Sequence, residues 1–520
     1  MAKGLFRSGM VVSLMTFISR ILGLVRDAVT AHLLGAGAAA DIFLFANKIP
    51  NFLRRLFAEG AFAQAFVPVL TEVKEKDGDN GVRVFVAQAA GTLGTVLLIV
   101  TILGVLGSGV VAAIFAPGWY NEYVSGGAEG FKYELFSQML KLTFPYLFFV
   151  SLVALSGAVL NVYNQFSVAA FTPVLLNISI IGCAYYFHDK FEFGAFAMAL
   201  GVFIGGLVQL LFQLPFLRKN NVLVKPTFAW RDKNVKKVRT LMLPAMFGVS
   251  VSQINLLLDT VIASFLVTGS VAWLYYSDRL IEFPLGLFGI GIATVILPTL
   301  SKLHVNDDPK QFQATVDWGV RFVVWLGIPA CFGLIVLAPL IINVLFGHGE
   351  FMASGNHIEK VAMGVTAYAF GLLSFMLIKV LAPAFYAKQN TKTPAKIGVA
   401  AMVLNMVFNL ILAPMFGYLG LALATSLSAT CNAILLYYFL HKQGVYGVSK
   451  TTVWFFAKCL IASILMFLAV YQLQYYFPWQ QQGFMQQVAL LSGFIVVAVV
   501  VYFLLLVLMG VRFRQIKNIN

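Results

Sequence analysis

The stretch SRILGLVRDAVTAHLLGAGAAADIFLFANKIPNFLRRLFAEGAFAQAFVP spans residues 19–68. It carries charged side chains inside otherwise apolar sequence. They are Arg20, Arg26, Asp27, Asp41, Lys48, Arg54, Arg55 and Glu59. A charge at the centre of a bilayer costs about 2.5–3.5 kcal/mol even on lenient insertion scales. We therefore expect several of these side chains to line a water-filled, cationic cavity. The alternative, snorkelling to the headgroups from helix ends, applies best to Lys48, Arg55 and Glu59.

The composition around this stretch is that of a polytopic membrane protein. The 520 residues are 60% hydrophobic and 11% charged, and the mean hydropathy is +0.87. Soluble domains have about 25% charged residues. The net charge of +15 would indicate nucleic acid in a soluble protein. Here it belongs mostly to loops, where it sets orientation and meets anionic lipid, so we expect membrane lipids and no nucleic acid as partners.

About 20 apolar residues span a bilayer, and on this criterion the chain contains about fourteen transmembrane helices. They are expected near residues 8–34, 41–70, 85–115, 135–162, 167–187, 193–217, 237–267, 271–300, 318–346, 361–387, 395–415, 418–440, 454–475 and 486–510. The second and eighth are expected to be broken at Pro50 and Pro284. Broken helices are tolerated at membrane depth where they line a cavity or are buried in protein.

The distribution of Lys and Arg predicts the orientation. The connections expected at 218–239, 74–83, 388–396 and 442–450 are basic, whereas those at 35–40, 268–270 and 476–485 contain almost no Lys or Arg. This alternation follows the positive-inside rule and places both termini in the cytoplasm, as an even number of helices requires.

An internal repeat predicts the domain organisation. RDAVTAHLLGAG (26–37) aligns without gaps on LDTVIASFLVTG (258–269), which places Asp27 on Asp259. The offset of roughly 231 residues corresponds to six helices, so the copies keep the same topology. We predict an N-terminal six-helix lobe (1–219), a basic linker (220–236), a C-terminal six-helix lobe (237–442) and two extra helices (454–511).

Motifs of catalysis are absent from the sequence. It has no Walker A, no GxSxG and no metal-spaced His pair, and its four cysteines have no ligand spacing. We therefore expect a transporter and not an enzyme, with no cofactor and no certain metal site, driven by an ion gradient or the membrane potential.

The charged residues of the two lobes are the candidate site. Arg20 and Asp27 are seven residues apart, which places them on one helix face as a candidate pair, and Arg26 lies about 120° round from Arg20. Further cavity candidates are Asp27, Lys48, Asp278, Arg279, Glu282 and Lys379. Arg grips phosphate with two parallel hydrogen bonds, so an Arg-rich cavity suits an anionic substrate. The alternative is a neutral ion-pair network that only holds the lobes together.

A second constellation is a candidate ion site. Asp259, Asn405, Asn409 and Thr425 offer oxygen ligands for Na⁺ or a proton site. Asn405 and Asn409 are four apart and share a helix face. Hydrogen bonding between helices is the commoner role of Asn and Thr and stays open here.

Long segments of the chain closely resemble the MurJ/MviN lipid II flippases of bacteria. They include residues 19–69, LLNISIIG, FGVSVSQINLLLDTVIASFL, YYSDRLIEFPLGLFGIGIATVILP and VLAPAFYAKQNTKTPAKI. The resemblance implies the multidrug/oligosaccharidyl-lipid/polysaccharide exporter superfamily, with two six-helix lobes, and two added C-terminal helices. It also implies lipid II, the undecaprenyl-diphosphate-linked peptidoglycan precursor, as substrate, moved to the outer leaflet of the bacterial inner membrane by alternating access.

The resemblance assigns roles residue by residue. The cavity residues that meet diphosphate or drive lobe closure fall on Arg20, Arg26, Asp41, Arg54 and Arg279. Some members hold Na⁺ where Asp259, Asn405, Asn409 and Thr425 lie, but Asn409 stands where an Asp is expected. One carboxylate fewer leaves Na⁺ or H⁺ coupling open. The nearly uncharged segment 454–510 suits a groove for the isoprenoid tail.

Two other functions remain as alternatives. Another glycolipid or multidrug exporter of the same superfamily shares the architecture. A membrane enzyme acting on a polyprenyl-diphosphate lipid would use the same substrate, but such enzymes need acidic metal-binding loops or an external domain, and neither is evident. Partners among cell-wall synthesis proteins stay open.

Overall fold

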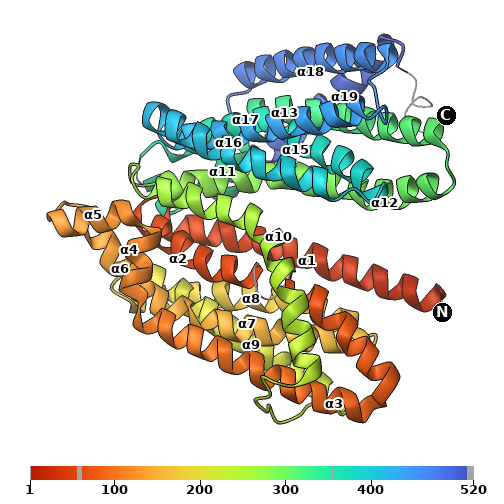
Figure 1. Ribbon diagram of the computed structural model, residues 1–520. Helices are drawn as coiled ribbons and strands as arrows, with labels where there is room; N and C mark the ends of the chain where they lie inside the picture. The colour runs from red at the N-terminus through yellow and green to blue at the C-terminus, as the bar shows by residue number, and fades with distance from the viewer. Residues whose placement is uncertain (1, 56–60, 354, 512–520) are drawn as a thin grey trace. The chain divides into compact units, whose positions relative to one another are not determined.

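The chain is helical throughout the part that the structure describes, residues 2–55, 61–353 and 355–511 of a computed structural model (Figure 1). No strand occurs among these residues, which confirms the predicted all-α class. Helices satisfy their own backbone hydrogen bonds, as an apolar segment in lipid requires. The helices form two compact units, and the chain first passes from one to the other between Ala272 and Trp273.

The first unit comprises Met1–Ala272 and the short segment His348–Ser354. Its helices are α1 (Ala2–Leu34), α2 (Ala38–Arg54), α3 (Ala61–Leu106), α4 (Ser108–Phe115), α5 (Pro117–Ser125), α6 (Phe131–Thr143), α7 (Pro145–Val162), α8 (Phe166–Phe187), the 3₁₀ turn η2 (His188–Lys190), α9 (Ala195–Lys219), α10 (Lys233–Ala263) and α14 (Glu350–Ala353). By packing, α10 thus belongs with the first unit, and the predicted lobe boundaries stay predictions.

The interior of the first unit is apolar and aromatic. Helix α8 packs against α9 and α1, and α7 packs against α9 and α3, as Figure 1 shows. The rings of Phe62, Phe66 and Phe85 stack in a core that α3 shares with α7, α9 and α10. Residues of the linker between α9 and α10 also enter this core, among them Val222. The linker is therefore part of the folded unit.

Helix α2 continues through Pro50 to Arg54, so the break predicted at Pro50 is wrong. Proline has no N–H to donate to the carbonyl four residues earlier. That carbonyl, of Ala46, accepts instead from the Thr143 hydroxyl at the end of α6, at 3.2 Å. A hydroxyl from a neighbouring helix thus replaces the missing backbone donor, which is a known way of keeping proline in a membrane helix.

Helix α3 covers the region where the sequence predicts the end of one span and the start of the next. The sequence places a basic connection at residues 74–83, whereas the structure has helical turns on both sides of Gly78. Gly78 has φ 61° and ψ −161°, a conformation that essentially only glycine adopts. Two helical segments of α3 therefore meet at a kink at Gly78, inside the predicted connection.

The second unit comprises Trp273–Gly347 and Gly355–Asn520. Its helices are α11 (Ser270–Pro284, with its first residues in the first unit), the π-helical turn η3 (Leu285–Gly289), α12 (Ile290–Val305), α13 (Pro309–Phe346), α15 (His357–Ala387), α16 (Lys392–Phe416), α17 (Tyr418–Lys442), α18 (Lys450–Tyr476) and α19 (Phe484–Leu508). At Pro284 the predicted break appears as a π-helical turn, and the helical segment continues from Ser270 to Val305.

The two C-terminal helices contact α13 through hydrogen bonds at three places: near its start, at its middle and near its end. Thr452 donates to Asp317 at 2.8 Å, the Tyr502 hydroxyl donates to the Trp325 carbonyl at 2.7 Å, and Asn343 donates to Gln487 at 2.8 Å. These contacts run along the length of α13. The extra pair predicted from the sequence thus packs as part of the second unit.

Eleven helical segments in the described ranges are long and apolar enough to cross a membrane. The chain is therefore a multi-pass membrane protein, while the predicted count of fourteen is not confirmed. The predicted spans outside these eleven correspond to α1, α2 and α10. Two of these, α1 and α2, contain most of the charged residues of the stretch 19–68.

Candidate functional site

Arg26 of α1 is held by groups from two helices. Its Nε and Nη2 both donate to Asp27 Oδ1, at 3.1 and 2.7 Å, and Nη1 donates to Asn177 Oδ1 of α8 at 3.2 Å. Asn177 also donates to the Ser19 carbonyl at 3.2 Å. The Arg26 side chain is 18% exposed and that of Asp27 only 1%. The guanidinium is thus a largely buried cation with a defined orientation.

The structure pairs Asp27 with Arg26 and not with Arg20, the partner that the helix-face argument predicts. The long, flexible arginine side chain reaches the neighbouring carboxylate even though adjacent residues point about 100° apart on a helix. Arg20 lies nearly two turns earlier on α1 and its side chain is exposed. Its place in a substrate cavity stays a prediction.

Arg54 and Arg26 share a buried neighbour. Arg54 Nε donates to Asn51 Oδ1, one turn earlier on α2, at 3.2 Å. Tyr146 of α7 is 2% exposed and interacts electrostatically with both arginines. Two of the three predicted cavity arginines of the first unit, Arg26 and Arg54, therefore lie near one buried phenol.

Lys48 connects α2 to α10. Its Nζ donates to Thr260 Oγ1 at 3.2 Å, and Thr260 donates onward to the Leu256 carbonyl at 2.8 Å. The structure thus gives this ammonium a hydrogen-bond partner within the protein. Asp259 precedes Thr260 on α10 and is partly buried.

Asp41 of α2 acts as a cap for the start of α11. Its Oδ2 accepts from the Gly269 N–H at 2.7 Å and its Oδ1 from the Ala272 N–H at 2.8 Å. The side chain is 2% exposed. A carboxylate at a helix N-terminus is stabilised by the orphan N–H groups and the helix dipole. Asp41 therefore fastens α2 to the segment that leads into the second unit.

Further contacts hold the same segment, residues 264–272, within the first unit. The Gly118 N–H donates to Ser264 Oγ at 3.1 Å. Lys132 of α6, which is 1% exposed, contacts both Thr268 and Glu129, and Thr268 donates to Glu129. Lys132 is a buried cation outside the predicted site, and it is neutralised by Glu129.

The remaining cavity candidates belong to the second unit. Arg279 Nη1 pairs with Glu282 Oε2 at 3.1 Å, with the side chains 30% and 52% exposed. Asp278 and Lys379 are also exposed, and the Lys379 stem lies beside Gly289 of the π-helical turn. A half-exposed ion pair of this kind contributes little to stability.

The candidate ion site is divided between the units. Asp259 is in the first unit, while Asn405, Asn409 and Thr425 lie in the second. There, Asn409 donates to Asn405 at 3.0 Å and Asn405 donates to Thr425 at 3.4 Å, which links α16 to α17. Among the described residues no group of three or more His, Cys, Asp or Glu could hold a metal ion.

Asn177, Tyr146 and Lys132 are site residues that the sequence analysis did not single out. Asn177 had a signal, because it is a polar residue within the apolar run LLNISIIG. Tyr146 and Lys132 had none, since a single Tyr within a predicted span, or a single Lys just before its start, is ordinary in a membrane protein. Their significance depends on which helices pack together.

Comparison with known proteins gives consistent matches along the chain. The family model described as lipid II flippase MurJ matches residues 30–491. A protein of Vibrio cholerae serotype O1, named probable lipid II flippase MurJ, is 55% identical over 517 residues, which are 99% of this chain and 98% of that one.

Solved structures match as well. A structure described as lipid II flippase MurJ in an inward closed conformation has a TM-score of 0.79 at 25% identity, covering 98% of this chain and 100% of that one. An inward-facing multidrug resistance MATE family transporter of the MOP superfamily has a TM-score of 0.67 at 13% identity, covering 84% and 97%. The second likeness extends to the fold alone.

Proposed function

Because the chain belongs to the lipid II flippase MurJ family, we propose that it moves lipid II from the inner to the outer leaflet of the bacterial inner membrane. Lipid II is the undecaprenyl-diphosphate-linked peptidoglycan precursor, and the transfer occurs by alternating access. The protein acts as a transporter and leaves the covalent structure of the lipid unchanged.

The oriented guanidinium of Arg26 is the observation that carries this proposal beyond family membership. A cation that is 18% exposed on a helix of a membrane protein marks a substrate pathway by default. Two helices fix its plane through Asp27 and Asn177. A diphosphate, with oxygens on a rigid geometry, is matched by such a planar donor edge.

Substrate binding exchanges partners at this guanidinium. Nε and Nη2 of Arg26 form the edge that grips a carboxylate or phosphate with two bonds, and Asp27 Oδ1 now accepts from both. The diphosphate competes with Asp27 for the edge, while Asn177 keeps Nη1 in place. In each unit we assign arginines to the headgroup: Arg20, Arg26 and Arg54 in the first and Arg279 in the second.

For the driving force we propose the membrane potential. An empty cationic site is favoured on the negative, cytoplasmic side, and the diphosphate neutralises it, so loaded and empty carriers respond differently to the field. Na⁺ or H⁺ at Asp259 is the alternative. The hydrogen bonds among Asn405, Asn409 and Thr425 support a helix-linking role for these three residues.

The basic connections support an orientation with both termini in the cytoplasm. In this orientation a thiol introduced at Gln482 reacts with an impermeant reagent added outside the cell, and a thiol at Lys233 does not. The isoprenoid tail remains in the bilayer along α18 and α19, which are almost free of charge.

The test is access of lipid II to an external probe. In bacteria depleted of their own flippase, expression of this chain restores cleavage of lipid II by an enzyme added outside the cell. Arg26→Ala is inserted and abundant but restores no cleavage. Arg83→Ala, at an exposed arginine of α3, is the matched control and restores it fully.

Two results would overturn the proposal. Full restoration of cleavage by Arg26→Ala would show that Arg26 is not part of a headgroup site. If the unaltered chain restored no cleavage, the proposed flippase function would be wrong. Incubation of the purified chain with lipid II tests the enzyme alternative, because a chemically changed lipid would replace leaflet transfer as the activity.

A further inference from the structure

The linker between α9 and α10 contains an extended strap, residues 223–231, that lies on α3. The Thr227 N–H donates to the Ala87 carbonyl at 2.9 Å, and the Ala229 N–H donates to Thr92 Oγ1 at 3.0 Å. Gly91 lies directly beneath, where a Cβ would come within 2.2 Å of the Thr227 carbonyl oxygen. The strap is thus fixed to a helix that is counted among the membrane spans.

Both ends of the strap are anchored. Val222 is 1% exposed and packs in the core with Val235. At the other end the Asp232 side chain accepts from the N–H groups of Asn234 and Val235, at 2.9 and 3.1 Å, and so caps α10. The strap therefore presents its outward side chains on a rigid support.

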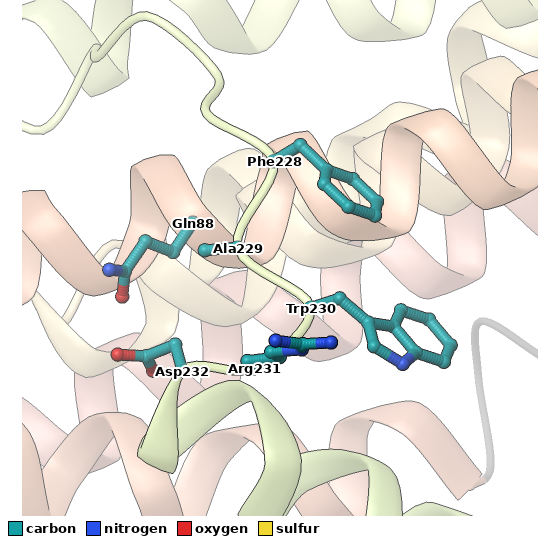
Figure 2. A pocket seen from close by; sticks show the side chains of 6 residues that line it. All are labelled: Gln88, Phe228, Ala229, Trp230, Arg231 and Asp232. Carbon is teal, nitrogen blue, oxygen red and sulfur yellow. The ribbon is translucent and has the colours of Figure 1, made fainter.

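Those outward side chains are large and apolar. Leu223, Phe228 and Trp230 are 44%, 62% and 43% exposed. Residues two apart in an extended segment point to the same side, and Figure 2 shows the rings of Phe228 and Trp230 on one side of the strap, with Gln88 and Asp232 on the other. A shallow hollow of about 770 Å³ lies along these residues.

Exposed cations flank the aromatic rings. Lys225 and Arg231 are both exposed, and the Arg239 guanidinium lies 4.1 Å from the centre of the Trp230 ring. The single acid of the strap region, Asp232, is engaged as the helix cap. The surface therefore combines apolar rings with an excess of positive charge.

The backbone of the strap suits a position at the edge of the bilayer. An N–H without a partner is costly at membrane depth. Proline at 226 has no N–H, and the donors of Thr227 and Ala229 are satisfied by α3. Trp is enriched at the membrane interface, because its side chain has an apolar body and a polar N–H. Lys and Arg near a leaflet attract anionic lipid.

We propose that residues 223–231 anchor the linker in the inner leaflet of the membrane, and we call this segment the linker anchor. Phe228 and Trp230 insert at the boundary between headgroups and acyl chains, and Lys225 and Arg231 bind the phosphate of an anionic phospholipid such as phosphatidylglycerol. The occupant is a bulk membrane lipid, and the inference does not depend on lipid II transport.

The test uses the full chain in phosphatidylcholine bilayers that contain a minor fraction of brominated lipid. Bromine near the upper part of an acyl chain quenches a tryptophan at that depth. The Trp230→Phe variant is subtracted from the unaltered chain, so the difference reports Trp230 alone. Brominated phosphatidylglycerol and brominated phosphatidylcholine are compared at equal mole fraction.

We expect brominated phosphatidylglycerol to quench the Trp230 emission more strongly, with a local enrichment of about fivefold for each basic residue. The double variant Lys225→Gln/Arg231→Gln reduces the ratio of the two quenching efficiencies to one. The matched double variant Lys392→Gln/Lys396→Gln removes two exposed cations elsewhere and leaves the ratio unchanged.

Three results would overturn the linker anchor. Quenching of Trp230 by aqueous iodide but not by brominated lipid would place the strap in water. Equal quenching by the two brominated lipids in the unaltered chain would remove the anionic-lipid site. An unchanged ratio in Lys225→Gln/Arg231→Gln would assign the enrichment to other residues.

Discussion

Asp41 and Gly269 are 228 positions apart in the sequence, yet the Asp41 carboxylate accepts the Gly269 N–H at 2.7 Å. The same carboxylate accepts the Ala272 N–H, at the last residue before the chain enters the second unit. The fixation of this crossing point by a side chain of α2 makes Asp41 a structural residue as well as a candidate for the transport cycle.

Replacement of Asp41 tests this role. Asp41→Ala leaves two buried N–H groups without their acceptor, and we expect the free energy of unfolding in detergent to fall by about 1–3 kcal/mol. Asp41→Asn keeps one acceptor oxygen, so its free energy of unfolding should lie between those of Asp41→Ala and the unaltered chain. Asp189→Ala is the control, because that side chain is 97% exposed. Equal stability of Asp41→Ala and the unaltered chain would contradict the cap.

Thr143 and Pro50 should be energetically coupled through the Ala46 carbonyl. Thr143→Val removes the hydroxyl that replaces the missing N–H of Pro50, and we expect a loss of about 1–2 kcal/mol of unfolding free energy. In the Pro50→Ala background the restored N–H bonds to Ala46, so the same change should cost little. A double-mutant cycle in detergent measures the coupling, and an equal cost in both backgrounds would refute it.

The planar edge of Arg26 should matter more than its charge. Arg26→Lys keeps the cation but cannot donate to Asp27 and Asn177 in the same plane, so we expect transport to fall by about ten- to hundredfold. Asn177→Leu removes the group that orients Nη1 and should reduce transport less. External cleavage of lipid II measures both, normalised to the amount of protein in the membrane. Full activity of Arg26→Lys would mean that a point charge suffices.

Gly91 should be required for the strap to lie on α3. A Cβ at this position overlaps the Thr227 backbone, so Gly91→Ala should lift the strap and speed tryptic cleavage after Arg231. Gly182→Ala, on α8 with no atom within 4 Å of the added Cβ, is the matched control. Cleavage at the rate of the unaltered chain would show that the strap adapts to the added methyl group.

A test of the energy source distinguishes coupling to the membrane potential from coupling to an ion site. One charge moved through 100 mV gains about 2.3 kcal/mol, enough to bias a two-state carrier roughly fiftyfold. We expect collapse of the membrane potential alone to stop flipping while Na⁺ and proton gradients are maintained, and Asp259→Asn to have a modest effect. Flipping that survives loss of the potential but fails in Asp259→Asn, or without Na⁺, would assign the coupling to the ion site.

Much of the architecture could be predicted from the sequence because hydropathy and helix length are local properties. The all-α class, the two C-terminal helices and the irregularity at Pro284 follow from residues close together in the chain. The charged stretch in α1 and α2 could also be recognised from the local sequence. The full set of partners could not, because Asn177 meets Arg26 only through the packing of α1 on α8.

Only the tertiary structure decided which groups act as hydrogen-bond partners for the Ala46 carbonyl, Asp41 and the linker strap, because each partner is distant in sequence. Pro50 lies inside a helix because a hydroxyl 97 residues after Ala46 supplies the missing donor. Asp41 caps α11, and Thr92 and Ala87 hold the linker strap. A buried polar group must find a partner wherever the fold brings one. The sequence by itself determined which residues need partners, and only the packed helices decided which residues meet that need.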